Sequence, residues 1–236
     1  ALLAQVESAK DGQGVNVMSP DKGLIDLKKA GVNTDKVIVS ELKYLQTMDS
    51  WMNERTLPLI KEYMKARLVA GNASNLDQRL DDINFNFYSK YLQGQKEQRA
   101  MDKRGLGGIN GTLGEAFGKL YVEKYFPAEA KAQMETYISY LKKGFEYHIA
   151  NLDWMSAETK VKAQEKLSKF SVKIAYPDTW KDYSKLQLTA PADGGTYYKN
   201  LQNITEWSYA KNLAKVGQPV DKTEWGMSPQ TVNAYY

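Results

Sequence analysis

The longest regular pattern in the sequence is a stripe of apolar residues in its middle. Apolar side chains recur there at steps of three or four residues: Met134, Ile138, Leu141, Phe145, Ile149 and Leu152. This spacing places all of them on one face of an α-helix. Pro127 precedes the stripe and suits the start of a helix, where its missing N–H costs nothing. The stripe therefore predicts a long amphipathic helix that begins near Pro127.

Further segments repeat this helical spacing over shorter lengths. Ser40, Thr56 followed by Pro58, and Ser156 suit the N-terminal ends of helices, because a hydroxyl oxygen there accepts a hydrogen bond from a free backbone amide. Another helix is predicted over about residues 76–92. The apolar positions with helical spacing are Leu42, Leu45, Met48 and Met52; Leu57, Ile60, Met64 and Leu68; Leu80, Ile83, Phe87 and Tyr91; Leu113, Phe117, Leu120 and Tyr121; and Ala163, Leu167 and Phe170.

The strongest interruption of this pattern is the stretch Gly105-Leu106-Gly107-Gly108-Ile109-Asn110-Gly111. Glycine at this density favours turns and loops. A phosphate-binding loop is the alternative, but the spacing does not match a dinucleotide fingerprint, and no Gly-Lys-Ser/Thr follows. We therefore expect a flexible connector between helices.

Two short runs are β-prone: residues 37–39 and residues 231–236. The predicted fold class is therefore mainly α, a multi-helix domain with a short β-strand near the C-terminal end. Along the chain we expect an irregular N-terminal segment over residues 1–36 and a helical domain over residues 37–175. A turn-rich connection over residues 176–236 then leads to the final strand.

Charge and cysteine content argue against several classes of function. Lys and Arg number 32 against 28 Asp and Glu, a net charge of +4. The two signs are interspersed, whereas nucleic-acid-binding proteins have a basic stripe. With no cysteine, the chain has no disulfide, thiolate metal site or cysteine nucleophile. No apolar run reaches the ~20 residues of a transmembrane helix, and residues 1–5 do not resemble a signal peptide. We expect no nucleic-acid partner, no transmembrane segment and no targeting signal.

The sequence has a single histidine, His148. It lies beside Ile149 at the edge of the apolar stripe, which favours a structural side chain, partly buried or hydrogen-bonded, over a catalytic base. A serine triad would need this same histidine, and no Gly-x-Ser-x-Gly elbow is present. The carboxylates of Asp81 and Asp82 are interpreted as a solvated helix face or cap. We therefore assign no catalytic and no metal-binding residue.

An ordered series of motifs in the second half of the chain is more specific. The motifs are Gly114-Glu115-Ala116-Phe117-Gly118 with its continuation to Phe126, Leu152-Asp153-Trp154-Met155, Glu158-Thr159-Lys160, Ala163-x-x-Lys166-Leu167, Ile174-Ala175-Tyr176-Pro177-Asp178-x-Trp180, and Trp225 to Tyr236 with its Asn233-Ala234-Tyr235-Tyr236 ending. This series resembles the neprilysin-like zinc metallopeptidases, the family of neprilysin, endothelin-converting enzyme and bacterial PepO-type oligopeptidases. Residues 37–92 are similar to the family more loosely. Ala175 is a departure, because it stands where the family usually has glycine.

The resemblance implies a zinc-dependent endopeptidase that hydrolyses short peptides. In complete enzymes of the family, two His and one Glu hold a zinc ion that activates water, and a Glu acts as general base. The His-Glu-x-x-His helix of the family would follow Tyr236, so we expect this chain to be a middle portion that lacks zinc and is inactive alone. The remainder of the peptidase chain would be its partner. The resemblance also implies a location outside the cytoplasm.

The resemblance assigns substrate binding to Asn233 and Ala234, at the end of the turn-rich connection. In the family this edge strand hydrogen-bonds the main chain of the peptide through its backbone and the Asn amide. The helices would form a cavity wall that limits access to short peptides. The alternative is a non-catalytic helical binding or scaffold module derived from the same family.

Overall fold

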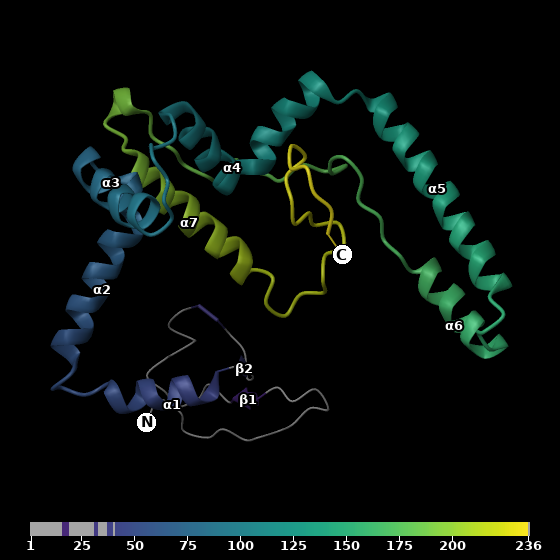
Figure 1. Cartoon of the computed structure of the whole chain (residues 1–236), viewed down its shortest axis with the longest axis horizontal. Coiled ribbons are helices and arrows are strands. Elements are labelled where there is room, and N and C mark those ends of the chain that lie inside the picture. The colour runs from purple at the N-terminus through teal and green to yellow at the C-terminus, as the bar shows by residue number, and fades with distance from the viewer. Residues whose placement is uncertain (1–15, 19–30, 33–36, 40, 236) are drawn as a thin grey trace. The chain divides into compact units, whose positions relative to one another are not determined.

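A computed structural model describes residues 16–18, 31–32, 37–39 and 41–235 of the chain. The described chain is mainly helical, as the apolar spacing predicts. Figure 1 shows its helices and strands in chain order. The chain divides into two compact units. Unit 1 comprises residues 1–98 and 186–220, and unit 2 comprises residues 99–185 and 221–236.

Unit 1 contains a short strand pair and a series of helices. β1 (Asn16–Met18) and β2 (Val37–Val39) are antiparallel, with Val17 opposite Ile38. Ser40, predicted as a helix cap, lies outside the described residues. The helical elements of unit 1 before residue 98 are α1 (Leu42–Trp51), α2 (Leu57–Asn72), the 3₁₀ turn η1 (Ala73–Asn75), α3 (Gln78–Asn84) and the π-helical turn η2 (Phe85–Tyr91).

Local signals explain where these helices begin. Thr56 stands at the N-cap of α2 with Pro58 in its first turn, as predicted, although the Thr56 hydroxyl makes no capping hydrogen bond. Asp77 caps α3, because its carboxylate accepts a hydrogen bond of 2.9 Å from the Leu80 amide. Asp81 is buried at 4% exposure, so the solvated helix face predicted for it is wrong. Its neighbour Asp82 is exposed, as expected of a helix position turned about 100° away.

Unit 1 also contains a helix that the sequence analysis missed. After the 3₁₀ turn η3 (Pro191–Asp193), α7 runs over Tyr197–Leu213. Thr196 caps it by accepting a hydrogen bond of 3.1 Å from the Lys199 amide. The Asn200 side chain exchanges hydrogen bonds of 3.0 and 2.9 Å with the Thr189 backbone, which joins the preceding loop to the helix.

Unit 2 is built on α4 (Met101–Tyr125), α5 (Ala128–Asn151) and α6 (Ala157–Ser168). α5 begins directly after Pro127, as predicted, and α6 is capped by Ser156, whose hydroxyl accepts from the Thr159 amide at 3.2 Å. Figure 1 shows α5 and α6 side by side, and Leu167 of α6 is buried. The Gln164 side chain donates to the Glu146 carbonyl across this contact, at 2.7 Å.

The connector predicted over the glycine-rich stretch is wrong, because these residues lie inside α4. Glycine costs a helix about 1 kcal/mol relative to alanine but does not prevent it from forming. The interruption falls instead at Leu113, whose φ of −118° and ψ of 31° are not helical. The preceding residue, Thr112, donates its hydroxyl to the Gly108 carbonyl at 2.7 Å, a bond that favours bending.

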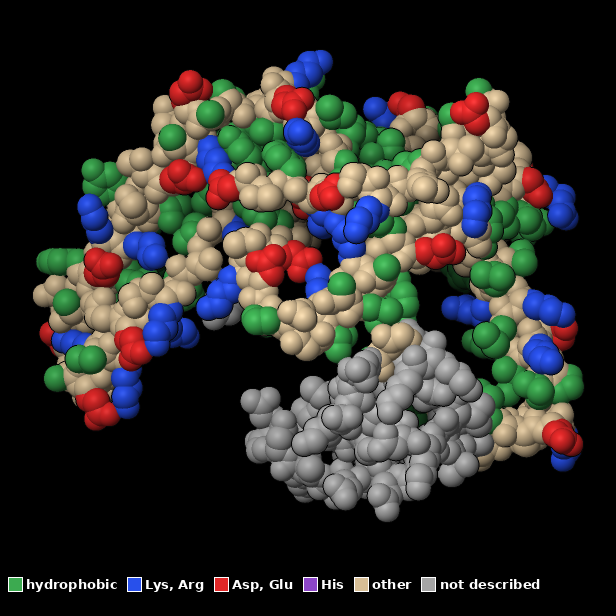
Figure 2. All heavy atoms as spheres, turned by 180° about the vertical axis from the view of Figure 1, so that it is seen from behind, with side chains coloured by type: hydrophobic (Ala, Val, Ile, Leu, Met, Phe, Trp, Pro, Cys, Tyr) green, Lys and Arg blue, Asp and Glu red, His purple; other side chains and the backbone are tan. Residues whose placement is uncertain are grey.

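The described helices carry many apolar side chains on their surface (Figure 2). On α5 the predicted stripe is only partly covered, since Ile138 and Ile149 are half-buried while Phe145 is exposed. Among the described residues, no helix is both long and apolar enough to cross a membrane.

Candidate peptide-binding segment

The residues predicted to bind substrate lie in a closed loop over residues 226–235 of unit 2. The amide of Gly226 donates a hydrogen bond of 3.1 Å to the Tyr235 hydroxyl, and the Tyr235 ring lies 3.6 Å from the position of a Cβ on Gly226. Near the loop's start, the Thr231 amide donates to the Ser228 carbonyl at 3.0 Å. The first hydrogen bond therefore joins the two ends of the loop, and the second closes a turn within it.

The base of this loop packs on a glycine face of α4. Gly114 and Gly118 are one helical turn apart, so they face the same side. A Cβ on Gly114 would lie 3.2 Å from the Ser228 side chain. A Cβ on Gly118 would lie 2.5 Å from Cδ of Pro229. Gly118 is buried, and no larger residue would fit there without moving the loop.

One side chain joins the loop to α4 by hydrogen bonds. The Gln230 amide nitrogen donates to the Asn110 side-chain oxygen at 2.7 Å and to the Gly114 carbonyl at 2.9 Å. The two acceptors stand on opposite sides of the non-helical residue Leu113. Gln230 therefore bridges the kink in α4.

The tip of the loop is open to solvent. Val232 is fully exposed, at 103%, and Asn233 and Ala234 are exposed as well. The hydrogen bonds here are local: the Asn233 amide donates to the Thr231 carbonyl at 3.1 Å, and the Ala234 amide donates to the Asn233 side-chain oxygen at 2.8 Å. Within the described part of the chain, the carbonyls of residues 232–234 have no hydrogen-bond partner.

The β-strand predicted at the C-terminal end is therefore not present over residues 231–235. A strand needs the amides and carbonyls of a second chain segment beside it. No described residue supplies such a ladder to this segment. The sequence pattern identified a segment with β propensity, but propensity without a pairing partner leaves it as an exposed loop.

A second motif, residues 174–180, is held to α5 and α4. The Lys131 ammonium on α5 donates to the Tyr176 carbonyl at 3.0 Å and to the Asp178 carboxylate at 2.5 Å, and it lies 4.4 Å from the centre of the Tyr176 ring. The Tyr176 ring stacks on Trp180 at 6.1 Å and meets Phe126 edge-on. These contacts hold the motif against the end of α4.

Glu115 extends this attachment to residues 181–183. Its carboxylate accepts from the Lys181 amide at 2.5 Å and lies 3.6 Å from the Lys181 ammonium. Burial raises the pKa of the Tyr183 hydroxyl above its ordinary value of 10.0, and the negative charge of Glu115 raises that pKa further. A hydrogen bond with the Ala116 backbone acts in the opposite direction. The motif that begins at Gly114 therefore contacts two segments distant in sequence: residues 181–183, through Glu115, and residues 228–230, through Gly114 and Gly118.

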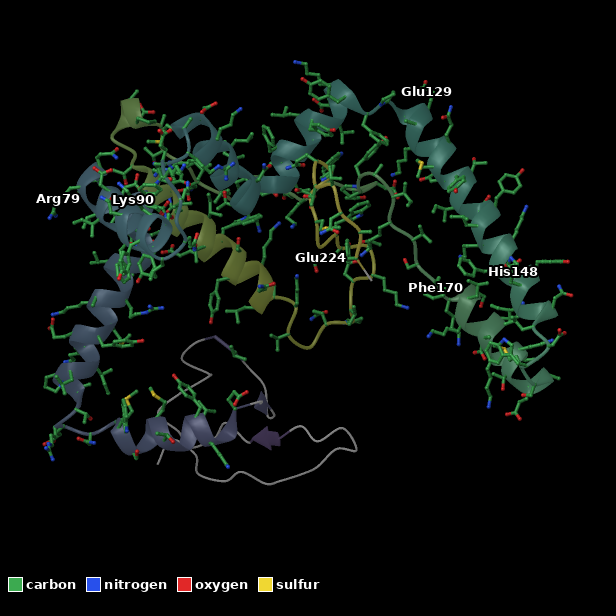
Figure 3. All side chains as sticks on the ribbon, in the orientation of Figure 1. Arg79, Lys90, Glu129, His148, Phe170 and Glu224 are labelled. Atoms are coloured by element: carbon green, nitrogen blue, oxygen red, sulfur yellow. The ribbon has the colours of Figure 1, made fainter. Side chains whose placement is uncertain are left out.

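The structure offers no histidine-based chemistry at this loop. Figure 3 labels His148, which is exposed in the last turn of α5 with its ring edge against Tyr147. The expectation of a partly buried or hydrogen-bonded histidine is wrong: His148 is exposed, no hydrogen bond joins its ring to another described residue, and only its neighbour Ile149 is half-buried. In the described part of the chain, no three His, Cys, Asp or Glu side chains converge to hold a metal. A catalytic zinc takes three protein ligands, and the described residues do not fit such a site.

Comparison with known proteins identifies the family. The sequence profile of Peptidase family M13 matches residues 15–177. The chain belongs to Peptidase family M13. Within that family it is 32% identical over 203 residues to the neutral endopeptidase of Lactococcus lactis subsp. lactis and 30% identical over 210 residues to neprilysin of Mus musculus. Each of these matches covers 86% of this chain.

Solved structures agree with the assignment to family M13. The zinc metalloprotease Zmp1 of Mycobacterium tuberculosis in its open state matches 96% of this chain with a TM-score of 0.82 and 32% sequence identity. PepO of Lactobacillus rhamnosis matches 86% with a TM-score of 0.74 and 25% identity. The chain spans about a third of the length of these relatives: 32% of the Lactococcus protein and 36% of the Zmp1 chain.

The sequence motif points to Asn233 and Ala234 but not to the residues that hold them. Gln230 stands in the motif as one residue among twelve, and nothing local marks it as a contact of α4. A Gly-x-x-x-Gly spacing on a predicted helix marks a face that another segment can approach closely, and this signal was available in the sequence.

Proposed function

We propose that this chain is part of a zinc-dependent endopeptidase and that residues 231–235 bind the main chain of a short peptide substrate. The observation that carries the proposal is the exposed tip of the loop, where the carbonyls of residues 232–234 have no partner among the described residues. An extended peptide needs such groups, because each of its amides must find a hydrogen-bond partner. The names of the relatives, endopeptidase and zinc metalloprotease, support the same function.

In this proposal, Asn233 and Ala234 bind the peptide by strand addition. The carbonyls of the segment accept from amides of the peptide. In the structure the Asn233 side-chain oxygen accepts a hydrogen bond from the Ala234 amide. When the peptide binds, this oxygen accepts from a peptide amide instead, and the Ala234 amide donates to a peptide carbonyl. The segment thereby becomes an edge strand, which it is not on its own.

The remainder of the peptidase chain supplies the zinc ligands and the general base in this proposal. Zinc, when bound there, would activate the water that attacks the scissile amide. The helices of this chain form part of a cavity wall that restricts access to short peptides, and residues 176–236 connect that wall to the binding strand. The enzyme is expected to act outside the cytoplasm.

Kinetics of an Asn233→Ala variant of the complete enzyme test the proposal. Loss of the Asn amide should cost about 1–3 kcal/mol of peptide binding, or about 5- to 150-fold in kcat/KM. Asn212→Ala, an exposed asparagine on α7, is the matched control and should leave kcat/KM unchanged. Equal kcat/KM for the Asn233→Ala and wild-type enzymes would remove Asn233 from the binding site.

A further inference from the structure

One side chain, Gln230, joins the loop over residues 226–235 to α4 by two hydrogen bonds. We infer that Gln230 is a positioning residue for peptide binding: through Asn110 and Gly114 it determines where Asn233 and Ala234 lie. The inference rests on the proposed function of residues 231–235. The Gln230 side chain is half-buried and bonded to α4, so the peptide would not touch it.

The geometry around the Gln230 amide leaves it little freedom. Its nitrogen uses both N–H groups, one on the Asn110 side chain and one on the Gly114 carbonyl. Its oxygen is buried with no hydrogen-bond partner in the described chain and lies 2.7 Å from the position of a Cβ on Gly118. An unpaired buried oxygen costs free energy. The two donated bonds therefore outweigh that cost and decide where the side chain lies.

The position of Gln230 limits where the tip of the loop can lie. Asn233 is three residues further on, within about 11 Å even if the chain is fully extended. The segment is fastened again at Tyr235 by its hydrogen bond with the Gly226 amide. Residues 231–234 are thus held between two fixed points, and displacing Gln230 would displace the groups that meet the peptide.

Strand addition is sensitive to such a displacement. The two strands must lie about 4.8 Å apart in register for their hydrogen bonds to form. A residue that holds the segment in place without touching the peptide therefore controls peptide affinity.

The decisive experiment compares Gln230→Glu with Gln133→Glu in the complete, zinc-loaded enzyme. Glu has the same length as Gln but presents a carboxylate to two oxygen acceptors. Gln133 is exposed on α5 in the same unit and controls for the added charge. We expect Gln230→Glu to raise KM for a short blocked peptide about tenfold or more with kcat within about twofold, and Gln133→Glu to change neither. Gln230→Met, which removes the donors without adding charge, should act in the same direction.

A readout that does not depend on turnover accompanies the kinetics. Amide hydrogen exchange of the folded variant should increase over residues 226–235 and stay at the wild-type level over α5 and α6. Wild-type KM in both Gln230 variants, or faster exchange spread evenly over unit 2, would overturn the positioning role. If Asn233→Ala raises KM while both Gln230 variants do not, the inference fails and the proposed function stands. If neither Asn233→Ala nor the two Gln230 variants change KM, residues 231–235 do not bind the peptide and the proposed function fails.

Discussion

The side-chain nitrogen of Gln230 lies 2.7 Å from the side-chain oxygen of Asn110, although the two residues are 120 positions apart. This contact brings the end of the described chain onto the middle of α4. It works together with the glycine face of that helix, because a side chain at Gly118 would occupy the space that Pro229 and Gln230 fill. The loop that carries Asn233 is therefore a part of unit 2 and not a free tail.

Gly118→Ala should destabilise this unit. The new Cβ would lie 2.5 Å from Cδ of Pro229, so the loop would have to shift, at a cost of about 1–3 kcal/mol. Gly107→Ala is the control: it lies in the same helix, nothing is within 4 Å of its Cβ position, and it should stabilise by up to about 1 kcal/mol. Urea unfolding of the two variants measures the difference. Equal free energies of unfolding would show that the loop does not pack on Gly118.

The alkaline stability of unit 2 should depend on Tyr183. Its pKa is raised in the fold by burial and by Glu115. The unfolded chain therefore loses this proton at a lower pH than the folded chain. This contribution to stability is fully present below pH 10 and is lost as pH rises through the folded pKa. Melting temperatures of the wild type and Tyr183→Phe are compared between pH 8 and about 11. Above about pH 10 the melting temperature of the wild type should fall more steeply with pH than that of Tyr183→Phe. Parallel curves would contradict the assignment.

The sequence predicted the elements whose signals are local. Pro127 and the apolar stripe predicted α5, and Ser156 predicted the start of α6, because caps and periodicity act within a few residues. The connector expected at the glycine-rich stretch is wrong because glycine lowers helix propensity without preventing a helix, and the kink falls instead at Leu113. The role of Gln230 could not be read from spacing, since it depends on contacts more than a hundred residues away in sequence.

The 236-residue chain by itself should not retain zinc. The described residues bring no three suitable ligands together, and the sequence has a single histidine and no cysteine. Elemental analysis of the purified chain after dialysis should give well under one zinc per molecule, and a chelator should leave its melting temperature unchanged, because a bound metal would otherwise stabilise the fold. Stoichiometric, slowly exchanging zinc would refute this expectation.

Ala175→Gly should stabilise the protein. Ala175 has a φ of +63°, and the amide of Tyr176 donates to the carbonyl of Ile174 at 2.8 Å, so Ala175 is the centre of a tight three-residue turn. A left-handed conformation costs a residue with a Cβ roughly 1–2 kcal/mol, while glycine adds about 0.4–1 kcal/mol of freedom to the unfolded chain. The net gain should be about 0.5–1 kcal/mol, seen as a higher urea midpoint. Ala132→Gly, within α5, is the control and should lose about 1 kcal/mol. If Ala175→Gly lowers the midpoint as much as Ala132→Gly does, the backbone at residue 175 is not strained.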